Sequence, residues 1–241
     1  MADVYGYDEA RIYLHQLKTD RLIKTRSAQE ASAEADSGIL FAGTKGPETN
    51  QILLFGYKAI AEILRNDAAA ANECMSAVEK LVRRQGFVPP VFMAPYLLCR
   101  FLTDIHFLNA ALARGNGRDI REYRRRARKS GRAAVKNSTK FAPLRTWSLT
   151  SMGVYYWLVD SRSDALTWWD RAMKEGERLG ARVDLSRAYF EVGRHLLKSD
   201  GKYRELNGVD AQGYLDKAQR LFEDMGLQRD LDELDRMQSE S

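Results

Sequence analysis

The stretch that predicts the fold reads Asp164-Ala-Leu-Thr-Trp-Trp-Asp-Arg-Ala-Met-Lys-Glu-Gly-Glu-Arg-Leu-Gly-Ala181. A degenerate copy follows at an offset of 46 residues, as Asp210-Ala-Gln-Gly-Tyr-Leu-Asp-Lys-Ala-Gln-Arg-Leu-Phe-Glu-Asp-Met-Gly-Leu227. The residues that coincide are Asp164, Ala165, Asp170, Ala172 and Gly180, which meet Asp210, Ala211, Asp216, Ala218 and Gly226. Helix-length copies at such a spacing are typical of stacked helical repeats. In this alignment we expect the shared Asp to cap each helix and the shared Gly to end it.

Apolar residues recur at helical spacing through most of the 241-residue chain. No alternating run rich in valine and isoleucine indicates a strand. We therefore expect an all-α protein with an N-terminal helical segment and linker at 1–46 and a helical-repeat array at 47–241. The helix pairs are predicted at about 48–86, 91–137, 143–181 and 183–228, followed by a short C-terminal cap helix. In the N-terminal segment, Ala10, Tyr13, Leu14 and Leu17 form one apolar stripe, and the Gly- and Pro-containing stretch Gly38–Asn50 is predicted to be a loop or linker.

Small residues recur where the two helices of a pair should cross. The first helices carry Gly56, Ala110, Gly153 and Gly193, and the second helices carry Ala127, Ala172 and Ala218. Small side chains let two helix axes approach closely while Tyr, Trp and Leu fill the flanking grooves. The pattern resembles the tetratricopeptide repeat, although the units here are about 40 to 46 residues long against about 34 in that family. The resemblance implies a right-handed superhelical array of antiparallel helix pairs, that is, a tetratricopeptide-like α-solenoid.

A narrower resemblance covers roughly Leu144 to Asp235. It is carried by motifs in this order: Met152-Gly-Val-Tyr-Tyr-Trp-Leu158, Ala165-Leu-Thr-Trp-Trp-Asp-Arg-Ala172, Glu177-Arg-Leu-Gly-Ala181, Ala188-Tyr-Phe-Glu-Val-Gly-Arg194, Tyr214-Leu-Asp-Lys-Ala218 and Met225-Gly-Leu-Gln-Arg-Asp-Leu231. The series resembles the C-terminal repeat region of bacterial signalling proteins that join a STAND-type AAA-like ATPase to a nucleotide cyclase, protein kinase or DNA-binding domain. These are packing motifs, so the resemblance transfers no catalytic residue. It implies an array that senses or recruits a protein or peptide partner. An ATPase or cyclase domain of a longer parent chain is one such partner.

The composition indicates a soluble, cytoplasmic protein. Basic residues exceed acidic ones by 38 to 33, and a net charge of +5 is too small to identify a partner by itself. Residues Met1 to Tyr13 lack the basic start and apolar run of a signal peptide. No apolar segment approaches the roughly 20 residues that span a bilayer. Cys74 and Cys99 lie in apolar helical surroundings and are predicted to be buried free thiols.

No constellation of residues predicts catalysis, and no cofactor or metal is expected. His15, His106 and His195 lie in separate helical segments without carboxylates at metal-ligand spacing. No Ser, Cys or Asp stands in a recognisable arrangement with a general base. An enzyme with a pocket between helices is therefore the least supported of the functions considered.

The one pronounced charge feature is the run from Arg118 to Lys136, which holds nine basic residues against Asp119 and Glu122. Arginine favours bidentate contact with carboxylates and phosphates. The run is consistent with a solvated outer face, with a site for an acidic protein surface, or with a site for nucleic acid. Replacing its arginines with Glu should abolish such binding, and affinity for nucleic acid should fall steeply with salt.

Trp168 and Trp169 are adjacent on a helix and point about 100° apart, so they cannot both face the same groove. Core packing of both is one interpretation, and the other is that one of them lines a concave surface and anchors a peptide. We expect a non-catalytic, regulatory interaction or sensor module that binds a peptide or partner domain on the concave repeat surface, with nucleic-acid or anion binding through Arg118–Lys136 as the alternative. The candidate partner-binding residues are Arg121, Arg124, Arg125, Arg128, Arg132 and Trp168.

Overall fold

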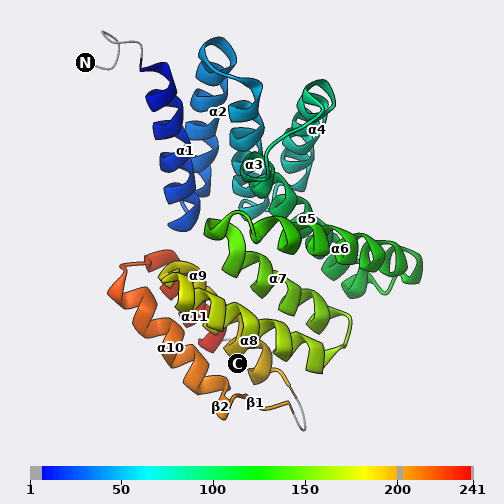
Figure 1. The fold of residues 1–241 in the computed structure, drawn as a ribbon. Helices are drawn as coiled ribbons and strands as arrows, with labels where there is room; N and C mark the ends of the chain where they lie inside the picture. Colours follow the sequence, from blue (N-terminus) through cyan, green and yellow to red (C-terminus); the bar gives the residue numbers. More distant parts are fainter. Residues whose placement is uncertain (1–6, 200–202, 240–241) are drawn as a thin grey trace. The chain divides into compact units, whose positions relative to one another are not determined.

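The computed structural model describes residues 7–199 and 203–239. Within these ranges the chain forms eleven α-helices, one short 3-10 helix and a single hairpin of two-residue strands (Figure 1). The prediction of an all-α protein is therefore confirmed. The chain divides into two compact units, Met1–Phe141 and Ala142–Ser241. The hairpin follows the helix that ends at Leu197, and residues 200–202 between them lie outside the described ranges.

The helices of the first unit are α1 (Asp8–Lys24), α2 (Ala28–Lys45), α3 (Glu48–Leu64), α4 (Ala68–Gln85), α5 (Pro90–Arg114) and α6 (Gly117–Ser138). The elements of the second unit are the 3-10 turn η2 (Ala142–Leu144), α7 (Arg145–Leu158), α8 (Arg162–Leu179), α9 (Arg182–Leu197), β1 (Glu205–Leu206), β2 (Val209–Asp210), α10 (Ala211–Asp224) and α11 (Gln228–Ser239).

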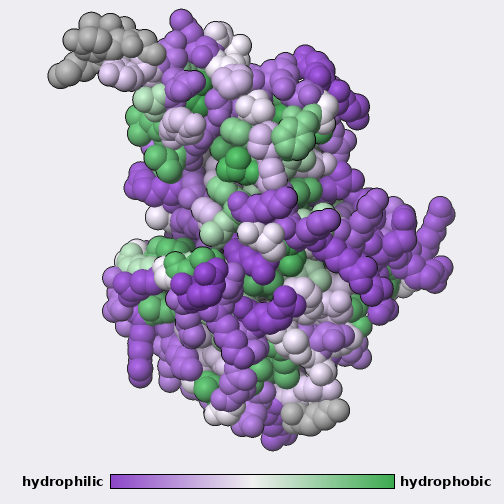
Figure 2. All heavy atoms as spheres, viewed as in Figure 1, coloured by the Kyte–Doolittle hydropathy of each residue, from purple (hydrophilic) through white to green (hydrophobic). Residues whose placement is uncertain are grey.

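In the first unit, helices that are consecutive in sequence pack against one another. The helices α1, α3 and α5 also contact one another in series, as α1 with α3 and α3 with α5. Figure 1 shows α1 to α4 side by side. Helix α3 has the densest core face, with Ile52, Leu54 and Ile60 fully buried. The last helix of the unit, α6, packs on α5, and hydrophilic side chains gather along it in Figure 2.

In the second unit, α7 packs on α8, α8 on α9, α9 on α10 and α10 on α11, and α7 also contacts α9. Large aromatic side chains fill its interior. One core group contains Trp157, Trp169, Met173, Leu196 and Tyr214. A second contains Phe190, Leu215, Phe222 and Leu234.

Glycine allows the close approach of the paired helices in the second unit. A Cβ atom at Gly153 of α7 would overlap the indole of Trp169 on α8. A Cβ at Gly193 of α9 would come within 2.7 Å of Leu215 on α10. Trp169 and Leu215 occupy matching positions in the two copies of the repeat, at the offset of 46. Both pairs are thus built by the same contact, and the predicted crossing role of these glycines is confirmed.

The prediction for Gly56 of α3 is wrong. Its Cβ would meet the backbone nitrogen of Tyr96 at 2.7 Å and Pro95 at 3.0 Å, both on α5. The glycine therefore faces the first helix of the next pair and not its own partner α4. The physical reason is that α3 packs on both sides, so the small residue serves the α3–α5 crossing.

The loop predicted at Gly38–Asn50 is also wrong, because α2 continues to Lys45 and only the turn at Gly46–Pro47 separates it from α3. Gly38 lies against the side chains of His15 and Leu54, and a Cβ there would come within 2.8 Å of His15 Cβ. A Cβ at Gly43 would come within 2.6 Å of the Gln51 amide nitrogen. These glycines stand at helix contacts, where a missing side chain is needed for packing and not for a turn.

The apolar stripe of α1 does not form its core face. Tyr13, Leu14 and Leu17 are between 50% and 69% exposed. The buried residues of α1 are Ile12, Gln16, Thr19 and Ile23, since α2 and α3 cover that side of the helix.

The two repeat copies agree at their ends and differ at their starts. Gly180 and Gly226 both adopt left-handed backbone, with φ of 62° and 63°, as predicted for helix stops. Asp210 caps α10 by accepting a hydrogen bond from Gly213 N at 2.9 Å. Asp164, however, is the third residue of α8 and accepts a hydrogen bond from Ser161 Oγ at 3.0 Å. The prediction that the shared Asp caps both helices is therefore wrong for Asp164. Helix α8 already begins at Arg162, whereas α10 begins directly after Asp210.

The expectation that no apolar segment is long enough to span a bilayer is wrong, because helix α5 is the one helix within the described ranges that is long and apolar enough to cross a membrane. Half of its apolar window is buried, and its main helix contacts are with α3, α4 and α6. The two cysteines are buried and free, as predicted. Burial raises the pKa of Cys74 to about 11 and that of Cys99 to about 12, so both thiols stay protonated near neutral pH.

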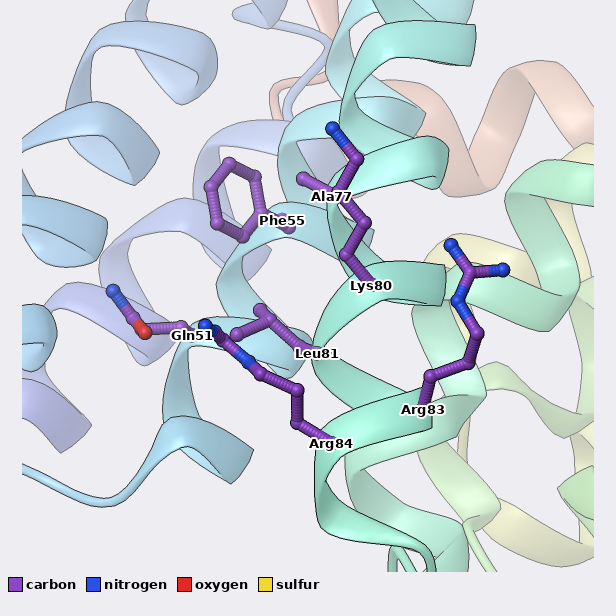
Figure 3. Close-up of a pocket in the computed structure, with 7 residues that line it drawn as sticks. All are labelled: Gln51, Phe55, Ala77, Lys80, Leu81, Arg83 and Arg84. Atoms are coloured by element: carbon purple, nitrogen blue, oxygen red, sulfur yellow. The ribbon is translucent and has the colours of Figure 1, made fainter.

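Helices α3 and α4 leave an apolar groove of about 490 Å³ between them (Figure 3). Phe55 and Leu81 point into it from the two helices, and Ala77 adds to the same side as Leu81. The polar residues at its edge are Gln51, Lys80, Arg83 and Arg84.

We predict that Gly153→Ala destabilises the second unit by about 1–3 kcal/mol, because the new methyl group overpacks against Trp169 and this outweighs the gain in helix propensity. All four tryptophans of the chain lie in this unit, so their fluorescence during chemical denaturation measures its unfolding. The exposed neighbour variant Thr167→Ala is the control and should change the unfolding free energy by less than about 0.5 kcal/mol. Equal stabilities for the two variants would contradict the close contact.

We predict that the second unit loses stability as pH falls below 6.5, the ordinary pKa of histidine. His195 lies against the rings of Trp157 and Trp169, and burial lowers its pKa. The unfolded state then binds the proton more readily than the folded state, so stability falls on acidification and is fully present above the unfolded pKa. Tryptophan fluorescence during denaturation between about pH 7.5 and 5.5 measures this slope. The slope should shrink in His195→Gln and persist in the exposed control His106→Gln.

Candidate functional site

The basic helix α6 starts at a well-capped turn. Gly115 ends α5 in the left-handed conformation, with φ of 68°. The side chain of Asn116 then accepts hydrogen bonds from the backbone of Arg118 at 3.1 Å and Asp119 at 3.3 Å. Asn116 also donates to the Asp119 carboxylate at 2.9 Å. These bonds satisfy backbone groups that a helix start leaves open, so the direction of α6 is set locally.

The inward face of α6 is made of small residues. Its buried positions are Ala127, Ser130, Gly131, Ala134 and Ser138. Small side chains bring the axes of α5 and α6 close, but they bury little apolar area. Phe107 of α5 stacks on Tyr123 at a ring distance of 5.3 Å and adds an aromatic contact near the start of α6.

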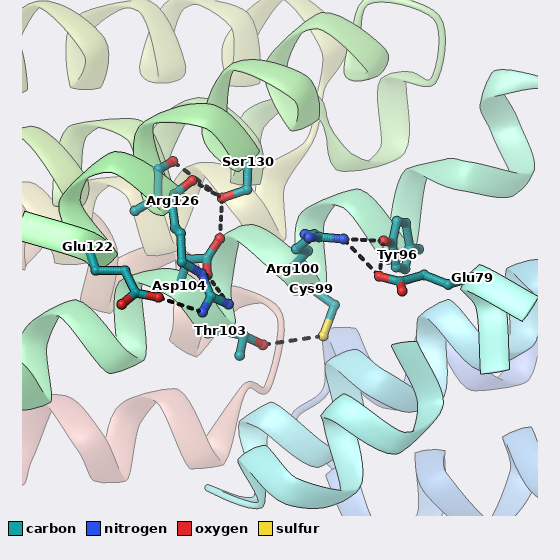
Figure 4. A network of polar contacts seen from close by, with 10 residues as sticks. Glu79, Tyr96, Cys99, Arg100, Thr103, Asp104, Glu122, Arg126 and Ser130 are labelled. Carbon is teal, nitrogen blue, oxygen red and sulfur yellow. Dashed lines mark hydrogen bonds and ion pairs between the residues drawn. The ribbon is translucent and has the colours of Figure 1, made fainter. Parts of the chain in front are cut away.

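One ion pair aligns the two helices (Figure 4). The Arg126 guanidinium donates to Asp104 Oδ1 of α5, at 3.0 Å from both Nε and Nη2. Ser130 Oγ donates to the other carboxylate oxygen at 2.8 Å. The Asp104 side chain is 3% exposed and the Arg126 side chain 41% exposed. A buried carboxylate is costly without its cation, so Arg126 is needed for packing and is not a candidate for partner binding.

The five predicted arginines all lie on the outer side of α6. Each is exposed, in contrast to Arg126: Arg121, Arg124, Arg125, Arg128 and Arg132. Their spacing of three and four residues places them along one side of the helix over about 16 Å. Other exposed basic residues extend this set to Arg118, Lys129 and Lys136. These eight residues form the cationic face of α6.

Trp168 belongs to the second unit and is half-buried. Its ring stacks on Tyr156 at 6.3 Å with an angle of 11° between the planes, and the Arg171 guanidinium lies 4.4 Å from its centroid. Trp169 is fully buried. The two rings therefore do point into different surroundings, as their adjacency on a helix predicts. Whether Trp168 anchors a peptide stays a prediction.

The three histidines lie in different surroundings. His15 Nδ1 is 2.7 Å from Glu34 Oε1, His106 is exposed beside Phe107, and His195 Nδ1 is 2.7 Å from the carbonyl oxygen of Glu191. Within residues 7–199 and 203–239, no three histidine, cysteine or carboxylate side chains come together in a group that could hold a metal ion.

A second set of exposed cations was missed from the sequence. Lys80, Arg83 and Arg84 border the apolar groove of the first unit. The available signal was the spacing of Lys80 and Arg84 by four residues in the last turns of α4, with the apolar Leu81 between them and Ala77 one turn before Leu81 on the same side. That pattern also suits the ordinary preference for basic residues at helix C-termini, so the sequence alone does not separate the two explanations.

A comparison with models of known protein families found none that matches this chain. A search of curated proteins also gave no match.

We predict that Arg126→Met lowers the unfolding free energy of the first unit by about 1–3 kcal/mol, because it leaves the Asp104 carboxylate buried without its cation. Chemical denaturation followed by far-ultraviolet circular dichroism measures the change. The adjacent variant Arg125→Met is the control, and it should change stability by less than about 0.5 kcal/mol because Arg125 is exposed. A larger loss in Arg125→Met would show that the outer arginines also support packing.

Proposed function

We propose that this protein is a non-catalytic interaction module that recruits an acidic partner protein through the cationic face of α6. The observation that carries the proposal is that the arginines of α6 point in two directions. Arg126 turns inward to Asp104, whereas the five predicted arginines point outward and are exposed. Packing of α6 therefore does not explain its outer face, and a partner rich in carboxylates would complement it.

The helix packing supports a repeat architecture for this module. In the first unit α1, α3 and α5 contact in series, and in the second α7 contacts α9, as stacked helix pairs require. The Gly153–Trp169 and Gly193–Leu215 contacts repeat one crossing in two successive pairs. We propose that both units are short stacks of the tetratricopeptide-like α-solenoid kind. A right-handed superhelix with a concave binding surface stays a prediction.

The sequence resemblance to repeat regions of STAND-type ATPase signalling proteins suggests a setting for such a module. In that setting the array would sense or recruit a regulatory protein, or restrain an ATPase or cyclase domain of the same parent chain. The motifs of this resemblance lie on α7 to α11, whereas the cationic face lies on α6.

Nucleic acid is the second candidate for this surface, because arginine binds phosphate as well as carboxylate. The face has the charge for it, with exposed arginines over about 16 Å. Around α6, however, the aromatic side chains that could stack on bases are engaged: Tyr123 stacks on Phe107 and lies under Arg126 at 5.2 Å. A surface of flexible cations without a stacking platform suits carboxylates better than bases.

The test compares two labelled probes, a glutamate homopolymer of about 20 residues and a DNA duplex of about 20 base pairs, by fluorescence anisotropy at salt concentrations from about 50 to 300 mM. The proposal expects the glutamate polymer to bind at least as tightly as DNA at equal salt. The triple variant Arg121→Glu/Arg125→Glu/Arg128→Glu should weaken that binding at least about tenfold, which is about 1.4 kcal/mol.

The control carries the same change of charge elsewhere, as Lys18→Glu/Arg21→Glu/Arg220→Glu on exposed positions of α1 and α10. It should keep most of the affinity if the cationic face is the site. Tighter binding of DNA than of the glutamate polymer would favour the nucleic-acid function. No binding of either probe at low salt, or equal losses in both triple variants, would refute the proposal.

A further inference from the structure

We infer that the groove between α3 and α4 binds an acidic amphipathic segment of a partner protein. In this assignment the apolar side chains of the segment pack on Phe55 and Leu81 (Figure 3). Its carboxylates meet Lys80 and Arg83 at the edge of the groove. This site is separate from the cationic face of α6 and goes beyond the proposed function.

The floor of the groove is apolar and comes from two helices. Phe55 of α3 is only partly buried, whereas Leu54 and Gly56 beside it in the chain are buried. Leu81 of α4 is 5% exposed and Ala77 is partly buried. Because Ala77 has a small side chain beside these larger ones, space is left above the ring of Phe55. A partly exposed aromatic ring in such a hollow is the usual receptor for an apolar anchor residue.

Helix α2 adds an apolar side chain next to this floor. Asp36 of α2 pairs with Lys58 of α3 at 2.6 Å, and the Gln51 side chain of α3 donates to the carbonyl oxygen of Ile39 at 3.3 Å. Asp36 and Gly43 both meet α3, and Leu40 lies one turn from each of them, so Leu40 stands on the side of α2 that faces α3. It is 75% exposed. An apolar ligand in the groove would cover Leu40 as well as Phe55.

The edge of the groove is cationic and has little compensating charge. Glu48 forms an ion pair with Arg84 at an N–O distance of 2.8 Å and accepts a hydrogen bond from the Gln85 side chain. Glu79 of α4 turns toward α5, where Arg100 Nη1 and the Tyr96 hydroxyl both donate to its Oε1 (Figure 4). Among the described residues, no carboxylate lies within ion-pair distance of Lys80 or Arg83. Charge complementarity therefore selects an acidic ligand.

The dimensions suit a short peptide. A volume of about 490 Å³ holds a few large side chains and is within the usual range of ligand pockets. The lining residues extend from Ala77 to Arg84 on α4, which is about 10 Å of helix, or roughly two turns. An amphipathic segment with apolar anchors spaced by three or four residues and with Asp or Glu beside them matches both the floor and the edge.

The experiment selects ligands from a phage-displayed library of random peptides of about 16 residues, using the full chain as bait. Enriched peptides are then synthesised with a fluorescent label and their affinities measured by anisotropy. We expect the enriched peptides to contain apolar anchors at helical spacing with neighbouring Asp or Glu. Hydrogen exchange should show that the bound peptide protects α3 and α4.

Two variants test the site without disturbing the core, since the changed residues are exposed. Lys80→Glu/Arg83→Glu should weaken the selected peptides at least about tenfold, and Leu40→Ser should weaken them by a smaller factor. The control Lys18→Glu/Arg21→Glu, with the same change of charge on α1, should retain binding. The triple variant of α6 should also retain it, so that failure of this site and failure of the proposed function are distinguishable.

Four outcomes would overturn the assignment. The first two are that no peptide is enriched and that the enriched peptides lack acidic residues. The third is equal binding by wild type and Lys80→Glu/Arg83→Glu. The fourth is binding of vesicles of phosphatidylglycerol and phosphatidylcholine, with loss in the same variant and without peptide enrichment, which would assign the cationic edge to a membrane surface.

Discussion

The close approach of antiparallel helices is the constraint on which the rest of this protein depends. Where one helix carries glycine, the facing helix can place a large side chain directly against its backbone, as Trp169 does at Gly153 and Leu215 at Gly193. Such contacts give dense packing and many dispersion interactions, but they leave no space for an added methyl group. The same kind of contact occurs in two successive helix pairs of the second unit, α7 with α8 and α9 with α10.

The same constraint determines what remains on the surface of the first unit. Helix α6 approaches α5 through alanine, serine and glycine, so a narrow strip of the helix suffices for packing. The pair of the buried Asp104 with the partly exposed Arg126 aligns the two helices, because in another register the Asp104 carboxylate would be buried without its cation. The opposite side of α6 carries exposed cations. Between α3 and α4 the small residue Ala77 leaves a hollow, because no side chain among the described residues of the unit fills the space over Phe55.

Helical periodicity was a reliable guide to the elements and a poor guide to their neighbours. It predicted the helices because backbone hydrogen bonds and side-chain spacing are local properties. Glycine shows the limit of that reasoning, since the same residue type ends a helix at Gly180, permits a crossing at Gly153 and faces another pair at Gly56. In α2, Gly38 and Gly43 indicated a loop although both serve helix packing. The apolar stripe of α1 was misleading for a related reason, because its opposite side meets α2 and α3.

By itself, the sequence determined that the protein is all-α, that its paired tryptophans face different surroundings, that its cysteines are buried and that a basic helix presents exposed arginines. Each of these follows from composition or from spacing within one helix. Only the tertiary structure decided that Arg126, unlike the other arginines of the basic helix, pairs with Asp104, which lies 22 residues earlier in the chain. It also decided that Phe55 and Leu81, on two different helices, border one groove with a cationic edge. Contacts between helices depend on crossing positions and on the neighbours available at each side, and no single helix encodes them.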